Sequence, residues 1–544
     1  MVDKQPEGIE AQSASASTLI NDIEKSTSEG SSRKRVVSIK AQPGTDAVYV
    51  AKSTLLSQAL QDLGMGRYQW FLALVNSVGW FLSSFWLVSF KLIAPPAANE
   101  AKFFFSSSGD REAFLFISLC VGLTIGAASW PWMSDRLGRK WIFTSTLVLM
   151  GTGGLVGAGM PSFTGLCVVS FVMGFAIAGN VLIDTIILIE WVPASHQFLV
   201  CFRGLFRGLG ELVAAAVGWP FISEYTCGTG PDELSTEQAI SHQSRAVHSS
   251  SSGSCHCGNN KGWRYIWWTF GCITLFLYLC RFCFPLHEIP KYLLSRPRDA
   301  EATQLVKDMA SYNRRTTWLP EASFARIDST VDVDAQRSPQ SGLRVLSSST
   351  GGSLRAGILA LLLCVTGLTF ILHPNYLRLY LSSKGVSAVT PTTVSTSFLF
   401  SRYLYVSLCG IPGPILAAVL VKTKYGGRTR TGALITLLTG VLMLVAPVSR
   451  SQNAALIFSC LLSCTQHAGL AVLITYSVEV FAAPVRGFGL GVMGFFGGLF
   501  GLLGMIITTF NTAIADGAAV WFSGAVWIVM AGFWLILQER DVAA

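Results

Sequence analysis

The chain has 544 residues, of which 51% are hydrophobic and only 13% are charged. Soluble globular domains carry about 25% charged residues, so this composition excludes an ordinary soluble protein and predicts a membrane protein. The formal net charge of +9 does not indicate a nucleic-acid partner, because Lys and Arg accumulate in the cytoplasmic loops of membrane proteins. Residues 1–63 are polar and carry no apolar stretch long enough to span a membrane, which predicts a disordered cytoplasmic tail.

Twelve mostly apolar stretches are long enough to cross a bilayer, which takes roughly 20 helical residues. They cover residues 70–93, 112–133, 141–160, 165–189, 199–223, 264–285, 353–380, 395–421, 432–448, 454–477, 487–510 and 517–537. We therefore predict an all-α membrane protein with twelve transmembrane helices. Its six-helix halves, 64–285 and 353–537, are joined by a cytoplasmic linker, 286–352, and followed by a cytoplasmic tail, 538–544.

The short loops predict the orientation of the chain in the membrane. Loops 134–140 and 422–430 are basic, whereas loops 161–164 and 511–516 contain no base. Because basic loops stay in the cytoplasm, both termini are expected there. We expect a monomer in the plasma membrane.

An internal repeat supports two related halves. The segment "EWVPASHQ" begins at Glu190 and "EVFAAPVR" begins at Glu479, an offset of 289 residues. The same offset relates Gly138 to Gly427, each followed by Arg. Two loops that share one offset predict pseudo-symmetric six-helix halves, related by an axis along the membrane normal.

Several of these motifs carry a resemblance to a known family. The loop "DRLGRK" (135–140) and the two segments that start at Glu190 and Glu479 resemble loop signatures of the major facilitator superfamily. The stretches "GWRY" and "EIPKYL" are similar to its sugar-porter branch. "GMGRYQW", "GNVLID" and "PASHQ" resemble fungal members of the group related to synaptic vesicle glycoproteins. The resemblance covers about 64–537 and implies secondary transport by alternating access.

The resemblance also implies a cytoplasmic latch that holds the halves in the outward-open state. Glycine permits the tight turn that the loop after the second helix needs. The alternative is that the basic residues only set topology. The chain departs from the family pattern at Pro131, Gln197, Lys424 and Ala482. The candidate latch residues are Asp135, Arg136, Gly138, Arg139, Lys140, Glu190, Glu479 and Arg486.

Charged residues inside the spans are the candidates for the transport site, because ionisable groups at bilayer depth are costly and face the bundle interior. We expect Glu211, Arg207 and Arg402 to form a polar centre that receives an anionic or hydroxyl-rich solute; the alternative is a static ion pair. Asp184 is a candidate proton carrier, or else a structural partner of Arg203. Further candidate lining residues are Asn180, Asn375, Gln466 and His467.

The predicted outward loop, 224–262, contains three cysteines. Cys227 is expected to pair with Cys255 or Cys257, because an oxidising compartment permits a disulfide. The spacing of these cysteines and the nearby histidines is a poor match to a tetrahedral metal site, so no metal is expected.

The sequence shows no nucleotide-binding loop, metal cluster or nucleophilic triad, so we expect neither an enzyme nor a bound cofactor. The predicted function is proton-coupled transport of a small organic solute, such as an organic acid, a sugar or a related metabolite. The expected partners are the solute, protons and the lipid bilayer. Efflux of a secondary metabolite, and a sensor that does not transport, are the alternatives.

Overall fold

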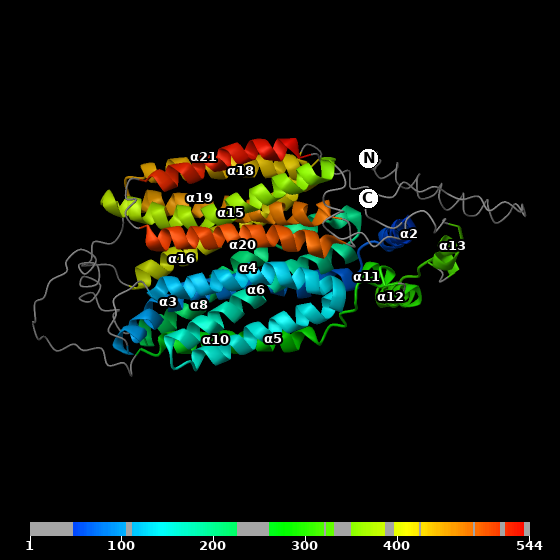
Figure 1. Ribbon diagram of the computed structural model, residues 1–544, viewed down its shortest axis with the longest axis horizontal. Coiled ribbons are helices and arrows are strands. Elements are labelled where there is room, and N and C mark those ends of the chain that lie inside the picture. Colours follow the sequence, from blue (N-terminus) through cyan, green and yellow to red (C-terminus); the bar gives the residue numbers. More distant parts are fainter. Residues whose placement is uncertain are drawn as a thin grey trace, which may run out of the picture.

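The computed structural model describes residues 47–104, 111–225, 260–296, 298–319, 322–330, 350–386, 396–423, 426–481, 485–511 and 517–537. The three loop cysteines, Lys424, Ala482 and the outer parts of both tails lie outside these residues. Figure 1 shows two bundles of long helices lying side by side, one from each half of the sequence.

The N-terminal half packs six long helices. Phe85 and Phe270 stack in its core, with ring centroids 3.9 Å apart, and the indole of Trp86 donates to Thr274 at 3.0 Å. The helices of this half are α3 (Arg67–Phe104), α4 (Arg111–Leu137), α5 (Arg139–Ala158), α6 (Phe163–Trp191), η1 (Ala194–His196), α7 (Phe198–Phe202), α8 (Leu205–Tyr225) and α10 (Gly262–Arg281).

The C-terminal half repeats this arrangement. Its eighth predicted span consists of two helices, because Pro412 has no backbone N–H to continue the helix that ends at Gly410. The helices are α15 (Thr350–Ser383), α16 (Thr396–Gly410), α17 (Pro412–Lys422), α18 (Gly427–Val445), η4 (Ala446–Val448), α19 (Gln452–Val480), α20 (Arg486–Phe510) and α21 (Ala518–Ile536).

The described residues contain ten helices that are long and apolar enough to cross a membrane. Helices α8 and α10, of 21 and 20 residues, occupy the fifth and sixth predicted spans. The structure therefore confirms the all-helical, twelve-span fold that the sequence predicts.

The two halves meet along helices α4 and α20, which lie side by side in Figure 1. Glycines on α20 face α4: a Cβ on Gly494 would lie 3.1 Å from the Cβ of Ala127, and one on Gly498 would lie 3.0 Å from the Cα of Thr124. Small residues let helix backbones approach this closely in a membrane. Helices α8 and α16 form a second contact between the halves.

A cluster of short helices lies at one end of the bundle, at the right of Figure 1. It comprises α11 (Pro290–Leu294), α12 (Asp299–Tyr312) and α13 (Ala322–Thr330) of the linker, together with α2 (Ala47–Leu63). The expectation that residues 1–63 are disordered is thus wrong for 47–63. Helix α2 buries Leu56 and Leu60, and its Lys52 Nζ lies 2.5 Å from an Asp299 carboxylate oxygen.

Candidate functional site

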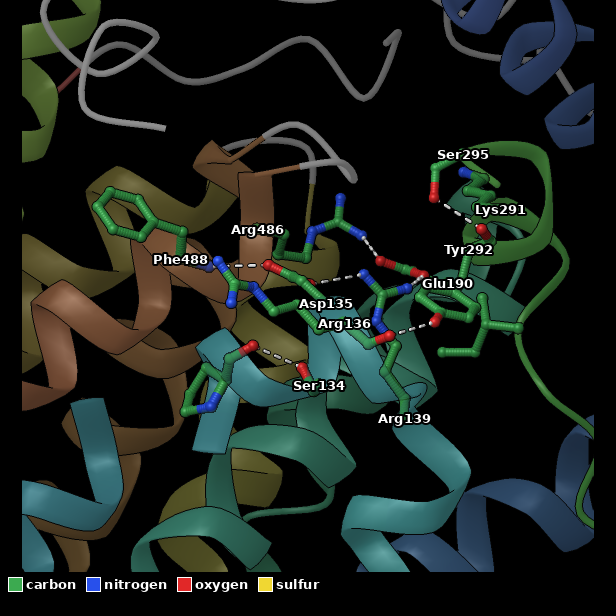
Figure 2. Close-up of polar contacts among 12 residues, drawn as sticks. Ser134, Asp135, Arg136, Arg139, Glu190, Lys291, Tyr292, Ser295, Arg486 and Phe488 are labelled. Atoms are coloured by element: carbon green, nitrogen blue, oxygen red, sulfur yellow. Dashed lines mark hydrogen bonds and ion pairs between the residues drawn. The ribbon is translucent and has the colours of Figure 1, made fainter. Parts of the chain in front are cut away.

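The first candidate site is the latch, at the end of the bundle that carries the short helices. Gly138 joins α4 to α5 with φ of +96°, a conformation that L side chains rarely adopt. This turn places Arg139 beside two acids. Its guanidinium contacts the carboxylate of Glu190 on α6 and lies 3.5 Å from Asp135 Oδ1 (Figure 2).

Both acids also bind the other half of the chain. Arg486 Nη1 at the start of α20 donates to Glu190 Oε1 at 2.7 Å, and the Phe488 backbone N–H donates to Asp135 Oδ2 at 3.1 Å. The Glu190 side chain is fully buried. A buried carboxylate is stable only when its charge is paired and hydrogen-bonded, so Glu190 holds Arg139 and Arg486 together across the interface.

The repeat places a second copy of this arrangement in the C-terminal half. Arg428 Nε lies 2.9 Å from Glu479 Oε2, as Arg139 lies against Glu190. Across the interface, Arg428 Nη2 donates to Gln197 Oε1 at 3.4 Å. Gln197 stands where the family pattern has Arg, so this copy has a neutral amide in place of the ion pair that Arg486 makes.

Two predicted latch residues take other roles. The Arg136 guanidinium lies over the ring of Trp132, 3.9 Å from its centroid, where a cation–π contact is favourable. Lys140 contributes through its backbone, whose N–H donates to Glu288 Oε2 at 3.4 Å. The backbone N–H of Arg139 donates to the other carboxylate oxygen, Glu288 Oε1, at 3.1 Å. Glu288, from the linker, thus caps the N-terminus of α5, where a carboxylate is favoured.

The linker places one further base near the latch, which the sequence analysis missed. Lys291 lies near the latch in Figure 2, beside Tyr292, whose hydroxyl donates to the Arg136 carbonyl oxygen at 3.1 Å. Burial of the Lys291 ammonium, together with the positive charge of Arg486, lowers the pKa of Lys291 to about 8. The position of Lys291 within the motif "EIPKYL" is the feature of the sequence that could have identified it.

The second candidate site lies between the halves, inside the bundle. Glu211 Oε1 on α8 lies 3.4 Å from Arg207 Nε, one helical turn away, and 3.3 Å from His467 Nε2 on α19. The Arg207 and Glu211 side chains keep 23% and 17% of their surface exposed. The structure therefore brings three predicted residues together at the interface, with Arg207 and Glu211 partly exposed and His467 buried.

Lys91 on α3 is a fourth member of this cluster, and the sequence analysis missed it. Its side chain is exposed, yet it interacts electrostatically with Glu211 and Arg207. Lys91 falls near the end of the first predicted span, where a lysine is easily taken for a residue that sets topology.

The structure does not bring Arg402 to this cluster. Its Nη2 donates to the Gln452 carbonyl oxygen at 2.7 Å, at the first residue of α19. His467 lies fifteen residues further along that helix, roughly 22 Å away at 1.5 Å per residue. Arg402 lies within the eighth predicted span, but its long side chain extends toward the end of the bundle.

Asp184 forms a separate pair inside the N-terminal half. Arg203 Nη1 donates to Asp184 Oδ1 at 3.1 Å, and both side chains are almost fully buried. The other carboxylate oxygen, Oδ2, has no hydrogen-bond partner among the described residues, nor has Asn180 Oδ1. A Cβ on Gly79 would lie 2.3 and 2.2 Å from these two oxygens, so both converge on one small space.

The remaining predicted lining residues lie apart from the Glu211 cluster. Asn375 is exposed and Gln466 is half-buried; in the described part of the chain neither makes a hydrogen bond to the cluster. The Asn180 amide donates to Thr146 Oγ1 at 3.1 Å.

Comparison with known proteins gives the family. Residues 70–505 match the model of the Major Facilitator Superfamily. The chain is 31% identical over 508 residues to "MFS siderochrome iron transporter 1" of Ceriporiopsis subvermispora, covering 90% of this chain and 91% of that protein. It is 24% identical over 469 residues to the niacin transporter NiaP of Acinetobacter baylyi, covering 85% and 91%.

Solved structures agree on the fold. The proton:xylose symporter XylE from E. coli superposes with a TM-score of 0.62 at 16% identity, covering 87% of this chain and 96% of that one. The family match spans most of the sequence, and the folds agree over both six-helix halves. The chain therefore belongs to the major facilitator superfamily, as a multi-pass secondary transporter and not an enzyme.

Proposed function

We propose that the protein carries a small carboxylated organic solute across its membrane together with protons. The observation that carries this proposal is the partly exposed cluster of Lys91, Arg207, Glu211 and His467, which draws residues from both halves. A solute bound there touches both halves, so its binding biases their relative position.

The composition of the cluster favours a carboxylate. Lys91 and Arg207 supply two positive charges against the one carboxylate of Glu211, and Arg binds carboxylates through paired N–H donors. Niacin, which the NiaP relative carries by name, is a pyridine monocarboxylic acid. The relationship to that protein therefore supports the same solute class.

The Asp184–Arg203 pair is the proposed proton site. A proton on Asp184 Oδ2 removes the negative charge that holds Arg203, and the neutral carboxylic acid can donate to Asn180 Oδ1, which lacks a partner. The competing interpretation is a static ion pair that fixes α6 against the turn between α7 and α8.

The topology completes the proposal. We place both termini in the cytoplasm, because the basic latch loops lie at the end of the bundle that carries the short linker helices. The plasma membrane is the proposed location. In this orientation the closed latch seals the cytoplasmic end, and the charged cluster faces outward.

Transport by purified protein tests the function. Proteoliposomes with an acidic exterior should accumulate labelled niacin or another labelled monocarboxylate, and dissipating the pH gradient should abolish the accumulation. Glu211→Gln should lower saturable uptake at least tenfold. The matched control is Glu301→Gln, an exposed acid on α12 that pairs with Arg298, and it should leave uptake unchanged.

The same assay separates the alternatives. Uptake of xylose but not of monocarboxylates would overturn the solute class. A second candidate solute is a ferric siderophore, favoured by the name of the relative at 31% identity, and selective uptake of ferrichrome would replace the carboxylate proposal by it. Binding without transport of any of these solutes would favour a sensor.

A further inference from the structure

A pocket lies on the outside of the N-terminal half, away from both sites described above. It has a volume of about 520 Å³ and lies where the turn between α2 and α3 meets the end of α12. The residues that give it chemical character are Arg67, Trp70, Phe71, Leu74, Asn313 and Arg315. No transport or latch role involves any of them.

One side of this pocket is apolar and faces outward. Trp70, Phe71 and Leu74 expose 53%, 51% and 53% of their surface, and they share one face of the first turns of α3. In a membrane protein such a face contacts acyl chains, and aromatic residues within the first turn of a span mark the headgroup boundary. The pocket therefore lies at the level of the lipid headgroups.

The other side of the pocket is basic. Arg67 precedes Trp70 by one helical turn, and Arg315 follows α12; both are exposed. Arg315 Nη1 contacts the Leu63 carbonyl oxygen, which leaves its other N–H groups available. Among the described residues the Arg67 guanidinium has no hydrogen-bond or ion-pair partner. Two arginines on one rim, without a carboxylate in the lining, match a phosphate group.

Hydrogen bonds from the linker fix the basic side of the pocket relative to its apolar side. Asn313 Oδ1 accepts from the Tyr68 backbone N–H at 2.8 Å, and its Nδ2 donates to Gln69 Oε1 at 2.9 Å. A Cβ on Gly66 would lie 2.2 Å from the Asn313 side chain, so only glycine permits this approach. The end of α12 is thereby fixed against the first turn of α3.

We propose that this pocket binds an anionic phospholipid of the adjacent leaflet. Its phosphate lies between Arg67 and Arg315, and its acyl chains lie along Trp70, Phe71 and Leu74. The lipid thus joins the linker helices to the first transmembrane helix. The proposal does not depend on the transported solute, because its tests measure lipid binding only.

Lipid titration of the purified full-length protein tests the site. Thermal unfolding in detergent is followed while palmitoyl-oleoyl phosphatidylserine, the matching phosphatidylcholine or inorganic phosphate is added. Phosphatidylserine should raise the unfolding temperature, and Arg67→Gln with Arg315→Gln should raise its half-saturating concentration about 25-fold, or fivefold for each charge near the surface. Lys307→Gln, an exposed base on α12, is the control and should leave the titration unchanged.

Equal titrations of the wild type and the double variant would overturn the proposal. So would equal stabilisation by phosphatidylcholine, whereas equal stabilisation by inorganic phosphate would reassign the pocket to free anions. If the double variant does not fold, a photoactivatable phosphatidylserine in vesicles gives the answer with the wild type. Mass spectrometry should then find the crosslink within residues 65–74 or 313–318, and crosslinks only elsewhere would contradict the site.

Discussion

Glu190 is the buried residue that Arg139 and Arg486 share across the interface between the halves. Removing one partner of a buried ion pair costs about 3–5 kcal/mol, because the remaining charges are left uncompensated. We therefore expect Glu190→Gln to open the latch. A cysteine placed at Ala127, which is buried against α20, should then react faster with maleimide in a background without other cysteines.

The matched control for this substitution is again Glu301→Gln. The Arg298–Glu301 pair is about half exposed, and exposed pairs contribute little because water screens them. Labelling of the Ala127 cysteine should keep its wild-type rate in this variant. Unchanged labelling in Glu190→Gln as well would mean that the helix contacts alone hold the latch closed.

Lys291 gives the stability of the protein a pH dependence. Its pKa is lowered to about 8 from an unfolded value of 10.5, so between pH 8 and 10.5 the unfolded chain binds more protons than the folded one. Stability contributed by this site therefore rises with pH across that window. The unfolding temperature of the wild type minus that of Lys291→Met should increase between pH 7.5 and pH 9.5. A constant difference between the two proteins would contradict this assignment.

At the residue scale, motifs that fix the spacing of charges identified residues that the structure places in contact, while their role as a latch stays a prediction. The latch pairs of Asp135, Arg139 and Glu190 follow from such a motif. Arg402 was assigned to the wrong cluster and Lys91 was missed, because the sequence gives only the position of a residue along a span. Depth does not say in which direction a long side chain extends or which neighbouring helix it meets.

Helices α4 and α20 form the contact along which the halves must move, and its glycines set how closely they approach. A leucine at Gly498 would meet the Thr124 backbone, since even a Cβ would lie 3.0 Å from its Cα. Overpacking of this kind costs about 1–3 kcal/mol. Gly498→Leu should therefore destabilise the closed latch and speed labelling of the Ala127 cysteine at least fivefold.

Gly532 on α21 offers a matched control for this substitution. A Cβ there meets nothing within 4 Å, so Gly532→Leu should leave the labelling rate unchanged. If both leucine variants behave alike, the close approach of α4 and α20 does not control the latch.

At the element scale, the long apolar spans were predictable from hydropathy, whereas α2 was not recognised. Its apolar residues Leu56, Ala59, Leu60 and Leu63 fall at helical spacing and are buried, and this periodicity was the available signal. The polar composition of the surrounding segment led to the prediction of disorder despite this periodicity. A short helix is stable here only because the linker covers its apolar face, and a partner distant in sequence cannot be read from local composition.

At the scale of the whole molecule, the duplicated halves have diverged in charge. The N-terminal latch copy holds the interface through Glu190 and Arg486, whereas the C-terminal copy contributes a hydrogen bond between Arg428 and Gln197. The buried Asp184–Arg203 pair likewise belongs to the N-terminal half. The N-terminal half thus carries most of the ionic chemistry, and the C-terminal half contributes His467 to the shared cluster.

This asymmetry predicts that a single carboxylate in the N-terminal half couples protons to transport. Asp184→Asn keeps the shape of the side chain but cannot gain or lose a proton. If Asp184 carries the proton, proteoliposomes with the variant should still exchange labelled solute across the membrane, yet should no longer concentrate it under a pH gradient. Asp308→Asn, at an exposed acid on α12, should keep both activities. A static ion pair gives another pattern, because losing its charge then weakens exchange and accumulation together.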